Sequence, residues 1–260
     1  MKKILLVLTV VALSLMLLAS CSTVVVDEEI ENNEVKENVV EPVAEDEAEA
    51  DVEADADAEE KVMTYAEYAA AELETEVVID AYVQGKQSWW DNKATVYTQD
   101  EDGAYFLYEM ACSEEDYALL EKGTHIKVKG YKAEWSGEVE IVDATFEVIE
   151  GSFVAEPVDA TALLGTEELV AHQNELVSFK GMTVENVSYK NDEPGDDIYV
   201  TLSKDGTSYD FCVEVYLTGT ETDVYKAVGE LENGDVVDVE GFLYWYNGAN
   251  PHITAITVAE

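Results

Sequence analysis

Hydrophobic and polar positions alternate over two stretches of the chain, and both stretches predict the same order of elements. The first predicts a strand through Ile79, two strands joined at Asp102-Gly103, a helix ending at Gly123, and closing strands through Val128 and Phe146. The second predicts strands over residues 176–187, 198–202 and 209–215, a helix over 223–230, and two closing strands around Gly248. A repeated order of elements predicts two domains of one kind.

An internal repeat supports this division. Residues 123–131 read GTHIKVKGY and residues 234–242 read GDVVDVEGF, with glycines at matching places and an offset of 111 positions. The offset continues to Gly137 and Gly248, so a turn and a following strand are shared as well. Two copies at so long a period indicate tandem domains, over residues 62–152 and 153–260, and not a solenoid.

Capping residues mark the ends of the predicted helices. Ser113 can cap the helix of the first copy, and Thr64 followed by Glu67 forms a capping box for a helix ahead of the first strand. A helix over residues 166–173 is expected to precede the second copy in the same way.

Three strands, a helix and two strands is the order of the OB-fold, a five-stranded Greek-key barrel. We therefore predict a mainly β protein with two tandem five-stranded OB-fold-like barrels and short helices. A pair of β-sandwich domains is the structural alternative, although each copy has few strands for a sandwich.

The N-terminus has the pattern of a lipoprotein signal. Two lysines follow Met1, residues 4–17 are apolar, and the small residues Ala19 and Ser20 precede Cys21. This predicts a signal peptide over residues 1–20 that is removed so that Cys21 becomes a lipidated N-terminus. An uncleaved membrane anchor is the alternative, because residues 4–26 carry no charge.

An acidic segment follows. Residues 22–61 contain 17 acidic residues against two lysines, with no aromatic residue and no glycine. Mutual repulsion and too few apolar groups predict that residues 21–61 form a disordered, extended linker.

The lipobox, the acidic linker and the repeated strand order together resemble bacterial surface lipoproteins that carry tandem OB-fold-like domains. The resemblance covers about residues 75–150 and 175–260. It implies a diacylglyceryl group on Cys21 and a location at the extracytoplasmic face of the cell membrane, anchored by lipid.

Charge narrows the expected partners. The chain has a formal net charge of −44 at pH 7 and contains 58 acidic residues against 14 lysines, with no arginine. Because nucleic-acid affinity comes mainly from Lys and Arg on phosphates, this composition argues against nucleic acid as a partner.

Four tryptophans are the candidate ligand-binding residues. In an OB-fold, ligands bind beside the loop after the first strand and the loop between the fourth and fifth strands. Trp89 and Trp90 fall in the first of these loops, Trp135 in the second, and Trp245 in the matching loop of the second copy. Neighbouring side chains of a strand point to opposite faces, so Trp89 and Trp90 cannot both enter one core. Packing against the other domain is the alternative role for these side chains.

A glycine bulge is expected to set which aromatics of the second copy face outward. If alternation continued past Gly130, it would bury Lys132, so we expect the register to flip there. Carried to the second copy, the flip turns Tyr244 and Tyr246 inward and leaves Trp245 exposed.

No metal, cofactor or catalytic site is predicted. His125, His172 and His252 are isolated, without the spacing of a metal motif, and no nucleophile motif or phosphate loop is found. Cys112 and Cys212 occur one per copy; buried free thiols are favoured over a bridge between the domains.

The sequence therefore predicts a non-enzymatic binding module that is tethered to a membrane and recognises a glycan or a protein ligand. Two alternatives stay open: a structural adaptor in an envelope assembly, and an accessory or remnant domain of an extracellular enzyme of nuclease-like or metal-dependent type.

Overall fold

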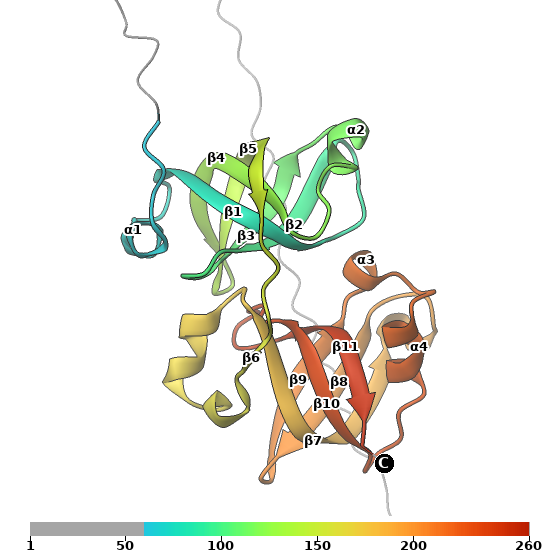
Figure 1. Cartoon of the computed structure of the whole chain (residues 1–260). Coiled ribbons are helices and arrows are strands. Elements are labelled where there is room, and N and C mark those ends of the chain that lie inside the picture. The colour runs from blue at the N-terminus through green and yellow to red at the C-terminus, as the bar shows by residue number, and fades with distance from the viewer. Residues whose placement is uncertain (1–59, 260) are drawn as a thin grey trace, which may run out of the picture. The chain divides into compact units, whose positions relative to one another are not determined.

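Strands dominate the part of the chain that the computed structural model describes, residues 60–259 (Figure 1). The predicted signal peptide, Cys21 and the acidic linker up to residue 59 lie outside the described residues. The described residues belong to one compact unit.

The first half forms a closed barrel with the strand order β1-β2-β3-β5-β4. Its elements are α1 (Tyr65–Ala70), β1 (Glu76–Lys86), β2 (Lys93–Gln99), β3 (Ala104–Ala111), α2 (Glu114–Tyr117), β4 (Thr124–Trp135) and β5 (Glu138–Ser152). β3 and β5 pair in parallel while the other neighbours are antiparallel. This order, with a short helix between β3 and β4, is that of an OB-fold-like barrel and confirms the prediction for the first copy.

Local sequence accounts for the helices of this barrel. The Thr64 side chain accepts from the Glu67 N–H, and the Glu67 side chain reaches back to the Thr64 N–H, so the capping box is confirmed. Ser113 caps α2 as predicted. The core is apolar and includes Ile79, Leu107 and Val128, which are fully buried.

The predicted flip of register at Gly130 is wrong for β4. A bulge does occur there, but the additional residue lies on β5, where Asp143 has φ +49°. The alternation of β4 therefore continues and buries Lys132, whose Nζ donates to the carbonyls of Tyr68, Ala69 and Ala71 at 2.9–3.0 Å. The three carbonyls at the end of α1 offset the cost of burying this ammonium group.

The second half forms a six-stranded sheet of order β10-β11-β9-β8-β7-β6, with an additional pairing between β10 and β7. Its elements are β6 (Val158–Asp159), the 3₁₀ helices η1 (Thr161–Leu163) and η2 (Glu167–His172), β7 (Leu176–Tyr189), η3 (Lys190–Asp192), β8 (Ile198–Lys204), β9 (Thr207–Val213), α3 (Val215–Thr218), α4 (Asp223–Gly229), β10 (Val236–Phe242) and β11 (His252–Val258). The segment predicted as a helix over residues 166–173 is a 3₁₀ helix, and the Thr166 side chain does not cap it. The short strand β6, parallel to β7, was not predicted.

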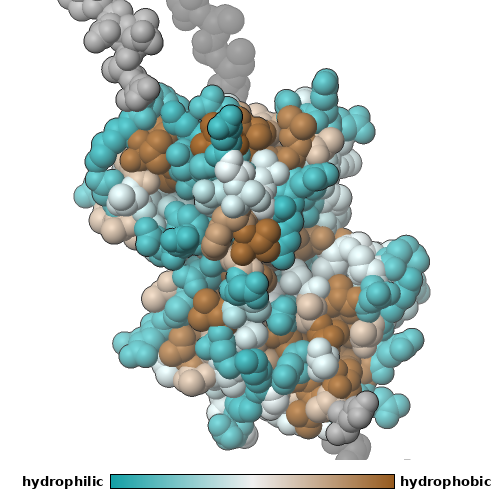
Figure 2. All heavy atoms as spheres, in the orientation of Figure 1, coloured by the Kyte–Doolittle hydropathy of each residue, from teal (hydrophilic) through white to brown (hydrophobic). Residues whose placement is uncertain are grey.

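A second, smaller apolar cluster joins the two halves. It contains Tyr97 and Phe106 from the first half and Leu176 and Phe242 from the second. The rings of Tyr97 and Phe242 are stacked, with centroids 4.2 Å apart and an interplanar angle of 5°. Elsewhere the viewed surface is largely hydrophilic, with apolar side chains gathered over β10 and β11 (Figure 2).

Candidate functional site

The loop between β1 and β2 presents one tryptophan to solvent on a tight turn. Trp90 and Lys93 exchange backbone hydrogen bonds of 2.8 and 3.2 Å, and Asp91 and Asn92 between them have φ of +47° and +59°. Both central residues are thus left-handed, as a type I′ hairpin turn requires, and Asp and Asn tolerate this conformation well. Trp90 is 76% exposed at the base of the turn.

Its neighbour Trp89 is held to the barrel. The Trp89 Nε1–H donates to the Cys112 carbonyl at 2.9 Å, and the side chain is half-buried. The two tryptophans therefore differ in environment, as the alternation of a strand predicts. Lys93 and Glu109 form an ion pair at 2.6 Å beside them.

A cleft of about 520 Å³ opens next to these residues, and we call it the aromatic cleft. Aromatic side chains from both halves of the molecule are among its lining residues. The residues that line it are Gln87, Ser88, Trp89, Trp90, Lys93, Thr95, Phe106, Tyr108, Glu109, Glu214, Tyr216, Tyr244 and His252.

The second half supplies one wall of the aromatic cleft. The Ser88 N–H donates to the Tyr216 carbonyl at 2.7 Å, which fastens α3 to the β1–β2 loop. Tyr216 is exposed, whereas Tyr244 is half-buried and stacks on His252 with ring centroids 4.4 Å apart. The cleft therefore combines exposed and half-buried aromatic faces in one space.

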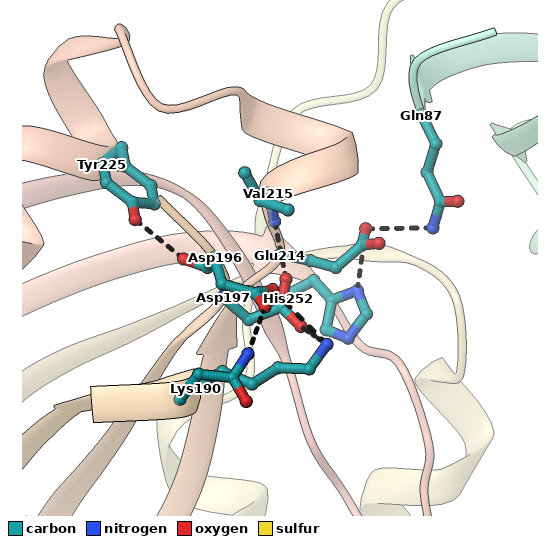
Figure 3. Close-up of polar contacts among 9 residues, drawn as sticks. Gln87, Lys190, Asp196, Asp197, Glu214, Val215, Tyr225 and His252 are labelled. Atoms are coloured by element: carbon teal, nitrogen blue, oxygen red, sulfur yellow. Dashed lines mark hydrogen bonds and ion pairs between the residues drawn. The ribbon is translucent and has the colours of Figure 1, made fainter. Parts of the chain in front are cut away.

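A polar network lies at the inner end of the cleft (Figure 3). The Gln87 Nε2 donates to Glu214 Oε2 at 2.9 Å, and His252 Nδ1 lies 4.0 Å from the same oxygen. His252 Nδ1 also makes a hydrogen bond of 3.0 Å with the Tyr97 hydroxyl. These contacts hold the Glu214 carboxyl between the two halves of the molecule.

Asp197 extends this network away from the cleft. Its carboxylate accepts from Lys190 Nζ at 3.0 Å and from the Val215 N–H at 2.9 Å (Figure 3). The second bond fixes the start of α3, so it positions both Glu214 and Tyr216 on the cleft wall.

Burial sets the protonation of the two titratable groups at the inner end. Desolvation, with a further contribution from Asp197, raises the pKa of Glu214 to about 7. Burial lowers the pKa of His252 to about 4, so this imidazole is uncharged at neutral pH. A carboxyl group with a pKa near 7 is poised to respond to a ligand charge.

The second tryptophan loop, between β4 and β5, is covered by the other half of the molecule. We call this region the sealed contact and define it by Trp135, Gly137, Glu138, Gln173 and Trp245. A Cβ at Gly137 would lie 2.8 Å from Trp245 Cδ1, so the indole packs directly on this glycine. Trp135 is 54% exposed, and its ring lies 5.2 Å from that of Tyr246.

Glu138 is the polar centre of the sealed contact. Its side chain is fully buried, and its Oε2 accepts from the Trp245 N–H at 2.8 Å and from Gln173 Nε2 at 3.2 Å. Burial raises the pKa of Glu138 to about 8, so the carboxyl group is largely protonated at neutral pH. The Oε1 atom is buried without a hydrogen-bond partner among the described residues.

The expected facing of the aromatics after Gly241 is wrong. Trp245 is half-buried, whereas Tyr246, expected to face inward, is 51% exposed. The reason is the same as in the first barrel: the additional residue of the bulge lies on β11, so β10 retains its own alternation.

Of the four predicted ligand-binding tryptophans, only Trp89 and Trp90 line the aromatic cleft. The sequence reasoning missed the cleft residues Tyr108, Glu214, Tyr216 and Tyr244. Tyr244 was placed in the core by the register argument, and residues 209–215 were assigned to one strand, which hid the turn into α3 that carries Glu214 and Tyr216.

The remaining candidates are quickly placed. Cys112 and Cys212 are buried free thiols, and burial raises the pKa of both. Within residues 60–259, no group of three or more His, Cys, Asp or Glu side chains is arranged to hold a metal ion. No helix in the same range is long and apolar enough to span a bilayer.

Comparisons with known proteins give likeness of structure only. No protein-family model matches the sequence, and no curated protein matches it. A murine DNA-binding protein bound to double-stranded DNA has a TM-score of 0.36 and 10% identity, over 70% of this chain and 95% of that chain. The Ifi202 HINa domain in complex with 20-bp double-stranded DNA has a TM-score of 0.33 and 12% identity, over 72% and 96%.

A third solved structure is asparaginyl-tRNA synthetase from Pyrococcus horikoshii, complexed with asparaginyl-adenylate. It has a TM-score of 0.28 and 20% identity, over 33% of this chain. The match spans only 19% of the synthetase.

The argument against nucleic acid as a partner is contradicted by these comparisons, because two of the similar structures are bound to double-stranded DNA. Net charge is a sum over the chain and does not describe a local surface, so it does not by itself exclude nucleic acid. Nucleic acid therefore belongs among the ligands that a binding experiment includes.

Proposed function

We propose that this chain is a non-catalytic binding module that takes a glycan in the aromatic cleft. In this proposal, residues 1–20 are a signal peptide, a lipid on Cys21 holds the protein at the extracytoplasmic face of the membrane, and residues 21–61 are the linker. Residues 62–152 and 153–260 are two OB-fold-like domains.

The strand order of the second half supports a second barrel. β7, β8, β9, β11 and β10 follow one another in the sheet as β1, β2, β3, β5 and β4 do in the first barrel. The antiparallel pairing of β10 with β7 joins the two ends of this series; it runs from Val236–Thr183 to Phe242–Leu176, with one register shift between Val237 and Val239. We assign β6 to an additional strand on the outside of that barrel.

The observation that carries the functional proposal is the composition of the aromatic cleft. Sugar rings present apolar C–H faces and polar hydroxyl edges. Aromatic rings such as Trp90, Tyr108 and Tyr216 offer flat faces for the first, and Gln87, Glu109 and Glu214 offer polar groups for the second. A volume of about 520 Å³ is within the usual range for a ligand pocket.

The test compares two exposed tryptophans, Trp90 inside the aromatic cleft and Trp135 outside it. The full chain is placed in lipid nanodiscs and titrated with soluble bacterial wall glycan fragments. Trp90→Ala is expected to weaken binding at least about fivefold, because the stacking of a nucleic-acid base on an aromatic ring contributes about 1–3 kcal/mol and a sugar ring stacks in the same way. Trp135→Ala, an exposed tryptophan outside the cleft, is expected to leave the affinity unchanged.

Three results would contradict the proposal: no binding of any glycan, equal effects of both substitutions, or glycan cleavage during the titration. Parallel titrations with a protein extract of the envelope and with double-stranded DNA distinguish the other classes of ligand. Binding confined to the envelope proteins would favour the adaptor, and glycan cleavage would favour the enzyme-derived alternative.

A further inference from the structure

The two walls of the aromatic cleft differ in whether their glutamate is paired with a positively charged side chain. On the first barrel, Glu109 is paired with Lys93 at 2.6 Å. On the other wall, the only ion-pair partner of Glu214 within residues 60–259 is the imidazole of His252, at 4.0 Å. Since burial keeps that imidazole uncharged at neutral pH, Glu214 has no charged ion-pair partner among the described residues.

Other titratable groups around Glu214 do not supply the missing charge. Lys190 is paired with Asp197 at 3.0 Å and with Asp196 at 3.4 Å (Figure 3). Tyr97 contacts His252 through a neutral hydroxyl, and Gln87 donates an amide N–H to Glu214. The carboxyl therefore accepts hydrogen bonds from neutral groups only.

A second carboxyl lies behind the aromatic rings of the cleft. Glu140 on β5 stands opposite Phe106 on β3 and is buried. Burial and the nearby Glu109 raise its pKa to about 7. Burial raises the pKa of the Tyr244 hydroxyl, and Glu138, Glu140 and Glu214 add smaller contributions in the same direction.

The rings themselves favour a positively charged group. The faces of Trp and Tyr rings attract cations, most strongly where water is partly excluded. Trp90 and Tyr216 are exposed in the cleft, and the half-buried Tyr244 lines it as well. The net charge of −44 also raises the local concentration of cationic ligands around the whole chain.

Resting on the function proposed above, we infer that the ligand of the aromatic cleft is an amino glycan, a polysaccharide whose sugars carry free, protonated amino groups. The sugar ring stacks on Trp90, and the ammonium group reaches the Glu214 carboxylate between Tyr216 and Tyr244. An N-acetylated sugar of the same backbone lacks the charge and leaves Glu214 without a counterion.

The test uses two oligosaccharides that differ only in acetylation: a hexamer of β-1,4-linked glucosamine and the same hexamer fully N-acetylated. The full chain in zwitterionic nanodiscs is titrated with each at pH 7, with empty nanodiscs as the blank. We expect the amino form to bind at least about tenfold more tightly, the difference that one charge-assisted hydrogen bond provides. Glu214→Gln is expected to remove this preference, so that the two hexamers bind the variant with affinities within about twofold of each other.

The matched control is Glu101→Gln, an exposed carboxylate at the β2–β3 turn, which is expected to retain the full preference. If the acetylated hexamer binds as tightly as the amino form, the inference is overturned and the proposed function stands. If neither hexamer nor any wall glycan binds, the proposed function itself fails. A preference that survives in Glu214→Gln and disappears at high salt would show general attraction to an acidic protein, and it would also overturn the inference.

Discussion

Two loops of the first barrel carry tryptophans, and the second half of the molecule treats them differently. At the β1–β2 loop it stands beside Trp90 and leaves the aromatic cleft open. At the β4–β5 loop it covers Gly137 and Glu138 with Trp245 and forms the sealed contact. Trp90 of the β1–β2 loop thus lines an open cleft, whereas Trp135 of the β4–β5 loop lies 54% exposed beside a contact that Trp245 of the second half fills. The comparison shows that the second half of the molecule covers one loop of the first barrel and supplies the opposite wall of the cleft at the other.

The largest difference is expected in stability, between removing Trp245 from the sealed contact and removing Trp90 from the aromatic cleft. Trp245→Ala removes the half-buried indole that packs on Gly137, and should lower the free energy of unfolding by about 2–4 kcal/mol. Trp90→Ala removes a ring that is 76% exposed and should change it by less than about 0.5 kcal/mol. Denaturant unfolding of both variants measures the difference. Equal losses of stability in the two variants would mean that the Trp245 indole does not pack on Gly137 in solution.

The second test uses the pH dependence of stability. The pKa of Glu138 is about 8 in the folded protein and 4.5 as its ordinary value, so the folded state holds the proton more tightly. Stability from this group is fully present below pH 4.5 and is lost as pH rises toward 8, with a slope of at most about 1.4 kcal/mol per pH unit.

Glu138→Gln has a neutral side chain at all pH values. Between pH 5 and 8 the variant should therefore lose about 1–3 kcal/mol less free energy of unfolding than the original protein. Glu214→Gln at the cleft should give a smaller effect, because the pKa of Glu214 is about 7. His252, with a pKa of about 4, adds an opposite trend, and stability from it is lost as pH falls below 6.5. Denaturant midpoints of the original protein, Glu138→Gln and Glu214→Gln, measured over this pH range, test which substitution changes the pH dependence more. The same pH dependence in all three proteins would contradict the prediction.

The third test concerns the close approach at Gly137. Gly137 has φ +92° and no room for a Cβ against Trp245, whereas Gly206 in the β8–β9 turn has φ +82° and no atom within 4 Å of a Cβ. Both Gly→Ala substitutions carry the cost of a left-handed residue, about 1–2 kcal/mol. Gly137→Ala should cost about 1–2 kcal/mol more, because the Trp245 indole must move. Thermal unfolding of the pair measures this excess, and its absence would mean that the indole moves away freely.

The smallest effect is expected at the inner end of the aromatic cleft. Tyr97→Phe removes the hydroxyl that contacts His252 Nδ1 at 3.0 Å in a buried site, and should cost about 1 kcal/mol. Tyr108→Phe removes the hydroxyl of an exposed ring in the same cleft and should cost close to nothing. Chemical denaturation distinguishes the two. A larger loss for Tyr108 would show that the cleft is more closed in solution than its geometry indicates.

Much of the fold was predictable from local patterns. The repeat at residues 123–131 and 234–242 placed β4 and β10, and the alternation correctly buried Val128 and Val239. Capping residues placed α1 and α2, and α4 was found within one residue of its predicted end. These features depend on neighbours within a few residues, so a single sequence contains them.

The candidate site was only half predictable. Trp89 and Trp90 could be assigned to a ligand loop because strand order alone places that loop. The opposite wall, with Glu214 and Tyr216, comes from residues more than a hundred positions away, and no local pattern brings them to the same cleft. Which of two paired strands carries the additional residue of a bulge was also unpredictable, because either strand can accommodate it.

The sequence by itself therefore determined the order of strands, the repeat, the helix caps and the aromatic content of the loops, because each depends on short-range periodicity and conformational preference. The tertiary structure alone decided that Lys132 is buried beneath α1, that Trp245 closes one loop, and that Glu214 faces the other. These outcomes depend on which surfaces of the two halves meet, and that contact is selected by packing and charge burial summed over residues distant in the chain.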